Sequence, residues 1–162
     1  MFPDDLQALA EHVVGRAIDR GLTLATAESC TGGLVAGALT AVAGSSAAVD
    51  RGFVTYSNAA KMQMLGVAEA TLAAHGAVSR ETALEMAQGA VERSEAQVAV
   101  SITGIAGPGG GSPDKPVGLV HFGSDGPAGP RHVERRFEGL DREGVRLTSV
   151  RQALEMLLEQ ME

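Results

Sequence analysis

Ser29 is the residue best placed for nucleophilic chemistry. It lies in the run ESCTGG over residues 28–33, where a short β-prone segment turns into a helix of small residues. A serine at such a turn is open to substrate and close to a helix dipole, as in a nucleophile elbow, although the run lacks the G-x-S-x-G form. The alternative is that Ser29 or Thr31 only caps the following helix.

Lys61 is the candidate base for Ser29. Only Lys61 and Lys115 are lysines among the 13 basic residues, so arginine supplies the positive charge almost everywhere else. Unlike arginine, a desolvated lysine can act as a base, and a helix N-terminus lowers its pKa. Lys61 falls in the first turn of a predicted helix, just after Tyr56, the single tyrosine. Two surface lysines left by chance are the alternative.

Cys30 and His75 are the rival catalytic groups. A thiolate at a helix N-terminus is activated by the dipole, but a lone cysteine is more often a small buried hydrophobe, and we favour that interpretation. A Ser29–His75 triad is conceivable, yet nothing near His75 in the sequence orients it. No Cys/His pair has metal-ligand spacing. We therefore expect no metal, no cofactor and no histidine-based catalysis.

A glycine-rich loop follows Thr103 and ends near Lys115. It could wrap a phosphate or a bound ring through the flexible backbone of Gly104, Gly107, Gly109 and Gly110. The spacing does not fit a Walker loop, and no second glycine fingerprint supports a dinucleotide. A flexible connector is the alternative interpretation.

Elements that would position these residues follow from the hydrophobic patterns. Helices are predicted over 3–20, 34–42, 58–65, 80–93 and from about 142, and strands over 22–29, 51–57, 96–103, 117–123 and 131–137. The last two strands should form an antiparallel hairpin. The alternation predicts an α/β fold, a three-layer α/β/α sandwich with a mostly parallel mixed sheet of about five strands, in a single domain over residues 1–162. Ligands of such sheets bind beyond the carboxyl ends of the strands, where the runs described above converge.

Composition and net charge limit the classes of molecule that this protein can bind. A net charge of -7 and only five aromatic residues argue against nucleic acid. No apolar run approaches a membrane span, the N-terminal residues lack the pattern of a signal peptide, and one cysteine cannot form an internal disulfide. We expect a cytoplasmic protein that acts on a small molecule.

Four segments together resemble the CinA C-terminal family, which includes stand-alone nicotinamide-nucleotide amidases. They read TLATAESCTGG, GSSAAVDRGFVTYSNAAKMQMLGV, HGAVS and SITGIAGPGGGSPDKPVGLV, and they cover most of residues 21–123 in the family's order and spacing. The resemblance implies an α/β/α amidase that converts nicotinamide mononucleotide to nicotinate mononucleotide and commonly self-associates.

The resemblance also implies individual roles. Ser29 matches the nucleophile and Lys61 the base, while Tyr56 and Thr103 match supporting hydrogen-bonding groups. Backbone N–H groups at the turn of Cys30, Thr31, Gly32 and Gly33 are expected to stabilise an oxyanion, and the glycine loop, Lys115 or an arginine to meet the substrate.

Arg142 marks a departure from the family pattern. Members often show a G-D-R run before the last helix, whereas Leu140 intervenes between Gly139 and Asp141 in this chain. Arg142 is therefore expected either to contact the phosphate or to form a surface ion pair. Two other functions stay open, a non-catalytic nucleotide-binding module and a serine amidase for another small carboxamide.

Overall fold

A five-stranded sheet forms the centre of the computed structural model, which describes all residues from 1 to 162. The strand order is β2-β1-β3-β4-β5, with β1 at Leu24–Glu28, β2 at Val49–Val54, β3 at Val98–Gly104, β4 at Leu119–Asp125 and β5 at Arg131–Arg136. β1 pairs in parallel with β2 and β3, whereas β4 pairs antiparallel with β3 and β5. Only β4 therefore runs against the others, which confirms the predicted mixed sheet and its terminal hairpin.

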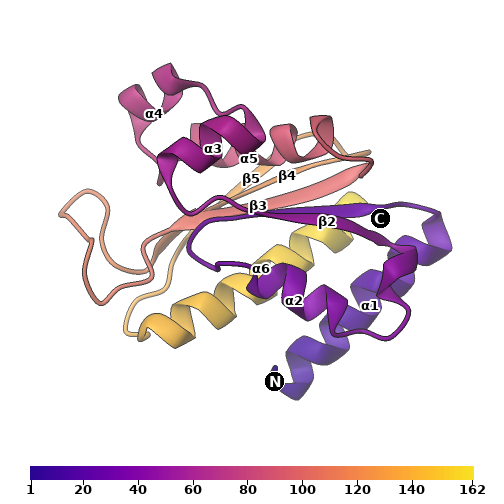
Figure 1. Cartoon of the computed structure of the whole chain (residues 1–162). Helices are drawn as coiled ribbons and strands as arrows, with labels where there is room; N and C mark the ends of the chain where they lie inside the picture. Colours follow the sequence, from indigo (N-terminus) through magenta and orange to yellow (C-terminus); the bar gives the residue numbers. More distant parts are fainter.

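Helices cover both faces of this sheet (Figure 1). One face carries α1 (Asp4–Arg20), α2 (Leu34–Thr40) and α6 (Arg142–Gln160), and the other carries α3 (Asn58–Leu65), α4 (Glu69–His75) and α5 (Arg80–Glu92). The three-layer α/β/α architecture is therefore confirmed. None of the helices has the length and apolar surface that a membrane crossing requires.

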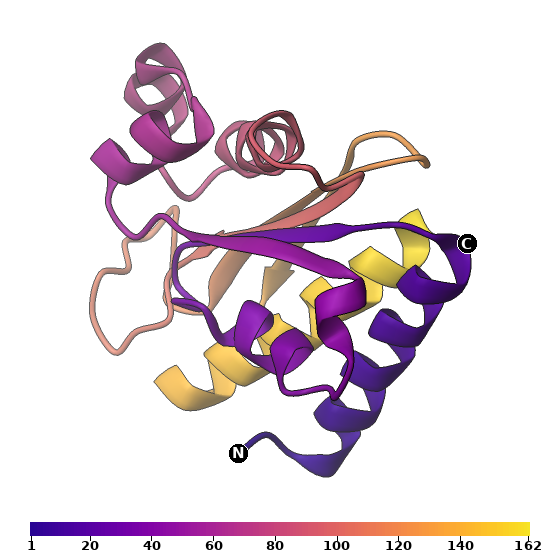
Figure 2. The same ribbon diagram turned by 45° about the vertical axis from the view of Figure 1, so that its right-hand side comes forward.

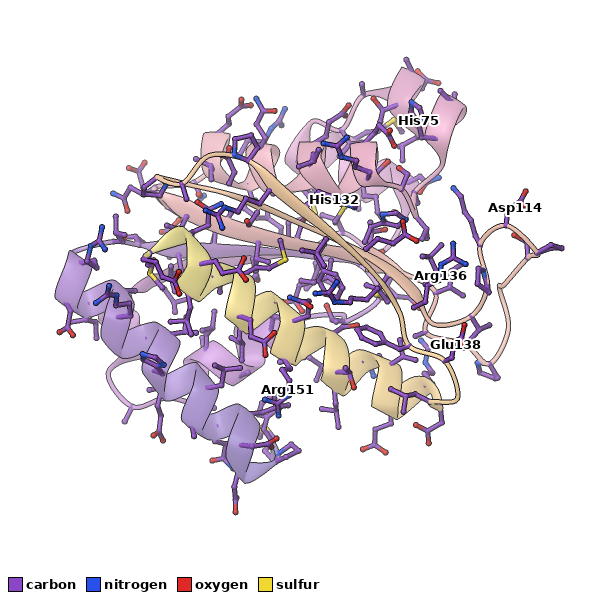
Figure 3. All side chains as sticks on the ribbon, turned by 180° about the vertical axis from the view of Figure 1, so that it is seen from behind. His75, Asp114, His132, Arg136, Glu138 and Arg151 are labelled. Carbon is purple, nitrogen blue, oxygen red and sulfur yellow. The ribbon has the colours of Figure 1, made fainter.

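Two apolar cores lie between the layers. The larger one packs α1, α2 and α6 against the sheet, and the smaller one lies under α3 and α5. The amphipathic pattern of α1 buries Leu6, Ala10 and Val13, and its exposed Asp5 pairs with Arg151 of α6, which is labelled in Figure 3. Burial of apolar surface is the main force that holds these layers together.

Most helix boundaries follow the predictions. α3 begins and ends as expected, α5 starts after its predicted cap Ser79, whose hydroxyl accepts from the Thr82 amide, and α6 begins at Arg142. Two elements were not predicted, a short 3-10 turn at Ser45–Ala47 and α4. α4 buries none of its residues, so it has no apolar stripe for a pattern to reveal.

The carboxyl ends of β1, β2 and β3 lie at one edge of the sheet because the three strands are parallel. The long connection between β3 and β4 extends beyond the same edge (Figure 2). The segments that leave these three strands are therefore neighbours, although they are far apart in sequence.

Candidate active site

A cavity of about 280 Å³ opens at this edge of the sheet. Its walls come from the segments after β1, β2 and β3, the loop before α5 and the first residue of α6. The lining residues are Ser29, Cys30, Tyr56, Asn58, Lys61, Ala77, Val78, Thr103, Gly104, Ile105, Ala106, Gly107, Gly109, Gly110 and Arg142. Open α/β sheets bind ligands at this place, so we take the cavity as the candidate site.

Ser29 and Lys61 meet inside the cavity. The Oγ of Ser29 lies 2.9 Å from the Nζ of Lys61, and both residues are buried. The Ser29 amide donates to the carbonyl of Ile102 on β3 at 2.9 Å, which fixes the serine where β1 ends. The Lys61 amine also donates to the carbonyl of Thr55 at 2.8 Å and forms no salt bridge. A hydroxyl paired with an amine in this way is a nucleophile with its base in reach.

Burial lowers the pKa of Lys61 from its ordinary value of 10.5 to about 8. The residue is only 1% exposed, so little water is left to solvate an ammonium ion. Its partners are the Ser29 hydroxyl and the carbonyls of Thr55 and Tyr56, and no carboxylate restores the charged form. The neutral amine that could accept the Ser29 proton is therefore accessible near pH 8. Of the two causes expected from the sequence, desolvation and the helix dipole, desolvation by burial is the main one here.

Glu28 holds the turn that carries Ser29. Its carboxylate is fully buried and accepts from the Thr31 hydroxyl at 2.7 Å and from the amides of Val35 and Ala36 at 2.9 and 3.0 Å. Those two amides belong to the first turn of α2, where a carboxylate both satisfies free N–H groups and complements the helix dipole. Glu28 thereby ties the end of β1 to the start of α2. No residue pattern in the sequence indicates this role of Glu28.

Gly32 and Gly33 complete this turn. Their φ angles of 58° and 101° lie in the left-handed region that side chains rarely adopt, which explains two adjacent glycines. Arg146 of α6 donates to the carbonyls of Cys30 and Thr31 at 3.1 and 3.2 Å. Hydrogen bonds from Glu28 and from Arg146 therefore both hold the turn in place.

Cys30 is a buried apolar residue, as favoured from the sequence. It is 6% exposed and belongs to the larger core, and burial raises the pKa of its thiol to about 11. The thiol is therefore neutral at physiological pH and a poor rival for Ser29. Its backbone matters more, because the Cys30 N–H pairs with no backbone carbonyl and the residue lines the cavity.

Tyr56 and Arg142 lie together at the cavity. Arg142 donates to the carbonyl of Gly107 at 2.7 Å and to the Tyr56 hydroxyl at 3.3 Å, and Tyr56 is 64% exposed. The arginine thus joins the start of α6, the loop after β2 and the loop after β3. Of the two roles expected for Arg142, the surface ion pair is not formed.

Thr103 and the glycine loop form another wall. The Thr103 hydroxyl donates to the carbonyl of Ala77 at 2.7 Å, and the residue is 1% exposed. Gly104 sits so close to β4 that an added Cβ would lie 2.7 Å from a methyl of Val120, and Gly107 has a φ of 82°. Gly109 and Gly110 also line the cavity.

Four expected binding residues do not line the cavity. Thr31, Gly32 and Gly33 lie within the turn, and of residues 30–33 only Cys30 lines the cavity. Lys115 instead donates to the carbonyl of His75 at the end of α4, at 2.6 Å. In Figure 3 His75 and Asp114, the neighbour of Lys115, lie at the same end of the molecule.

Five lining residues were not foreseen. Ile105 and Ala106 lie in the predicted glycine loop, and Ala77 and Val78 in the segment HGAVS, which figured in the sequence only as part of the resemblance. Asn58 is the first residue of α3, one turn before Lys61. The four apolar side chains among them carry no chemical signature, so only the fold could reveal these four.

No histidine lines the cavity that holds Ser29. His75 is 3.6 Å from Glu81 and does not line the cavity, so no Ser29–His75 triad forms. His121 and His132 face each other on β4 and β5, with ring nitrogens 2.9 Å apart. No three His, Cys, Asp or Glu side chains converge as a metal site.

Comparison with known proteins gives the same family as the sequence motifs. The model of the CinA C-terminal domain matches residues 6–161. The nicotinamide-nucleotide amidohydrolase PncC of Escherichia coli K12 is 52% identical over 161 residues, which cover 99% of this chain and 97% of that protein. A CinA-like protein of Anaeromyxobacter dehalogenans is 50% identical over 97% of this chain, but the chain spans only 38% of that longer relative.

Solved structures share the fold. The competence/damage inducible protein CihA from Agrobacterium tumefaciens has a TM-score of 0.98 and 56% identity, with 100% of this chain and 99% of that chain covered. A CinA superfamily protein from Escherichia coli has a TM-score of 0.91 and 38% identity, with 100% and 94% covered. From the matched residues, the relatives and the fold together, this chain belongs to the CinA C-terminal domain family.

Proposed function

We propose that this chain hydrolyses the carboxamide of nicotinamide mononucleotide to nicotinate mononucleotide and ammonia. The observation that carries the proposal is the 2.9 Å contact between Ser29 Oγ and Lys61 Nζ inside a cavity. The substrate comes from the relative in Escherichia coli, which is named a nicotinamide-nucleotide amidohydrolase and matches over nearly its full length.

Acylation would use Lys61 first as a base and then as an acid. The neutral Lys61 amine takes the Ser29 proton while Oγ attacks the carboxamide carbon, and the carbonyl electrons move onto oxygen. The Cys30 N–H, which has no carbonyl partner, is the donor we assign to this oxyanion. The C–N bond then breaks, the nitrogen takes the proton from the Lys61 ammonium, and ammonia leaves an ester on Ser29.

Deacylation would reverse the roles. Lys61, neutral again, takes a proton from water, and the resulting hydroxide attacks the ester carbonyl. The C–O bond to Ser29 then breaks, and Oγ recovers its proton from Lys61. The acid product ionises in water, and the site returns to its starting state.

Arg142 and the glycine loop would hold the rest of the substrate. Arg142 keeps guanidinium N–H groups at the cavity and is bound there to a carbonyl and a phenol, neither of which neutralises its charge. A phosphate could therefore exchange for the Tyr56 contact and gain a charge-assisted hydrogen bond. Tyr56 would then be free to cover the ring or the ribose. The resemblance also implies self-association, which sedimentation of the purified protein would test.

A substrate panel tests this proposal. Ammonia release would be measured from nicotinamide mononucleotide, nicotinamide riboside, nicotinamide and glutamine, and nicotinate mononucleotide would be followed by chromatography. We expect turnover of the mononucleotide and at least about 100-fold lower kcat/KM for the others, because they lack the phosphate or the whole nucleotide. Faster turnover of another carboxamide would favour a different amidase. Binding of the mononucleotide without ammonia release would favour a non-catalytic module.

A further inference from the structure

The hydroxyl of Thr103 has its single hydrogen committed within the protein. Its Oγ1 lies 2.7 Å from the carbonyl oxygen of Ala77. A carbonyl has no hydrogen to give, so the threonine must be the donor in this contact. Because Thr103 is 1% exposed, water cannot readily replace the carbonyl.

The Ala77 carbonyl is held in place by its surroundings. Ala77 follows Gly76, whose carbonyl accepts from the Ser79 hydroxyl at 3.0 Å and from the Thr82 hydroxyl at 2.8 Å. One residue earlier, the carbonyl of His75 accepts from Lys115 at 2.6 Å. The Ala77 carbonyl is therefore part of a fixed loop. The Thr103 O–H stays directed at this carbonyl and does not point into the cavity.

Thr103 is also close to the nucleophile. Ile102, its neighbour on β3, accepts the hydrogen bond from the Ser29 amide, and the parallel pairing of β1 and β3 places the residue after Glu28 beside the residue after Ile102. Ser29 and Thr103 both line the cavity. A group that reacts at Ser29 therefore lies within reach of Thr103.

We infer that Thr103 selects the carboxamide over the carboxylate by offering the bound group only a hydrogen-bond acceptor. A carboxamide has an N–H that can donate to Oγ1. A carboxylate has no hydrogen to donate, so its oxygen lone pairs would face the lone pairs of Oγ1. This inference rests on the proposed function and adds a reason why the product acid leaves. It also orients the substrate, with the amide nitrogen toward Thr103 and the oxygen toward the Cys30 N–H.

Binding to a protein that cannot turn over separates this role from chemistry. In the Ser29→Ala protein, Kd is measured for nicotinamide mononucleotide, for nicotinate mononucleotide, and for the methyl-ketone analogue in which CH3 replaces NH2. We expect both analogues to bind at least about tenfold more weakly than the amide, because neither donates to Oγ1. Equal binding of the amide and the methyl ketone would overturn the inference. This comparison of ligands needs no substitution at Thr103.

Substitutions test whether the preference for the amide over the acid depends on Thr103. Adding Thr103→Val should reduce the acid-to-amide ratio of Kd by at least about fivefold, and Thr103→Ser should restore it. Ser101→Ala is the matched control, because the Ser101 hydroxyl on the same strand donates to the carbonyl of Ala83 at 2.5 Å but does not line the cavity. The control should leave the ratio unchanged. A ratio unaffected by Thr103→Val would contradict the inference.

Failure of the proposed function would look different. If the unaltered chain releases no ammonia from nicotinamide mononucleotide, the function is wrong and the inference falls with it. If ammonia is released but the ratio of Kd does not respond to Thr103, the function stands and only the inference is lost.

Discussion

Burial of Lys61 should make the stability of the protein depend on pH in a defined window. The unfolded chain keeps the Lys61 proton up to about pH 10.5, whereas the folded chain loses it near pH 8. Between these values the unfolded state binds more protons, so the free energy of unfolding rises with pH. At about 1.4 kcal/mol for each tenfold change in proton affinity, the fall in pKa corresponds to about 3 kcal/mol. The charged form below pH 8 carries that cost.

Lys61→Met isolates this effect. Methionine has similar volume and no ionisable group, so the variant keeps the rest of the molecule and loses the pH-dependent contribution of Lys61. Cys30 contributes an opposite slope between about pH 9 and 11, because burial raises its pKa, and in that range its charge also interacts with that of Lys61. Below about pH 9 the Cys30 thiol stays protonated, so there the difference between the two free energies of unfolding reports Lys61.

Urea unfolding of both proteins between pH 7 and 10.5 measures this difference. We expect the variant's stability relative to the unaltered chain to fall by about 3 kcal/mol as pH rises from 8 to 10.5, and to stay constant below about pH 7. A difference that does not change with pH would mean that Lys61 has an ordinary pKa. The argument for its role as a base would then lose its physical foundation.

Three further predictions concern the same site. First, kcat/KM should rise about tenfold per pH unit below pH 8 and level off above it, because only neutral Lys61 can accept the Ser29 proton; a flat profile would contradict this. Second, Cys30→Ala should retain activity within about tenfold, and iodoacetamide should label Cys30 slowly at pH 8, since its thiol is buried and neutral; rapid inactivation by the reagent would point to a thiolate. Third, Glu28→Gln should lower the free energy of unfolding by about 3 kcal/mol, because an amide NH2 would face hydrogen-bond donors, and a loss below about 0.5 kcal/mol in chemical denaturation would refute this.

The order of elements could be predicted because most of them carry a pattern. α1 and α6 have apolar stripes, and β3 is a continuous buried run, so the alternation of helices and strands was visible. α4 could not be found in this way, because none of its residues is buried. The strand order is also absent from the pattern, since β1 pairs with β3 although α2, the 3-10 turn, β2, α3, α4 and α5 all lie between them in the sequence.

The candidate site was foreseen where residue type alone suggests chemistry. Ser29, Lys61, Tyr56 and Thr103 all line one cavity, together with Arg142. The positions that were misplaced are those whose role depends on three-dimensional direction. Thr31 and Lys115 have suitable chemistry, but Thr31 bonds to Glu28 and Lys115 to the His75 carbonyl, which no spacing rule indicates.

Ammonia release from nicotinamide mononucleotide, compared among four proteins, tests the central claim most directly. The unaltered chain and Ser45→Ala, which changes a similarly buried serine outside the cavity, should both turn over the substrate. Ser29→Ala and Lys61→Met should each fold and lose at least about 1,000-fold in kcat/KM, because one lacks the nucleophile and the other its base. Undiminished turnover by folded Ser29→Ala or Lys61→Met would contradict the account.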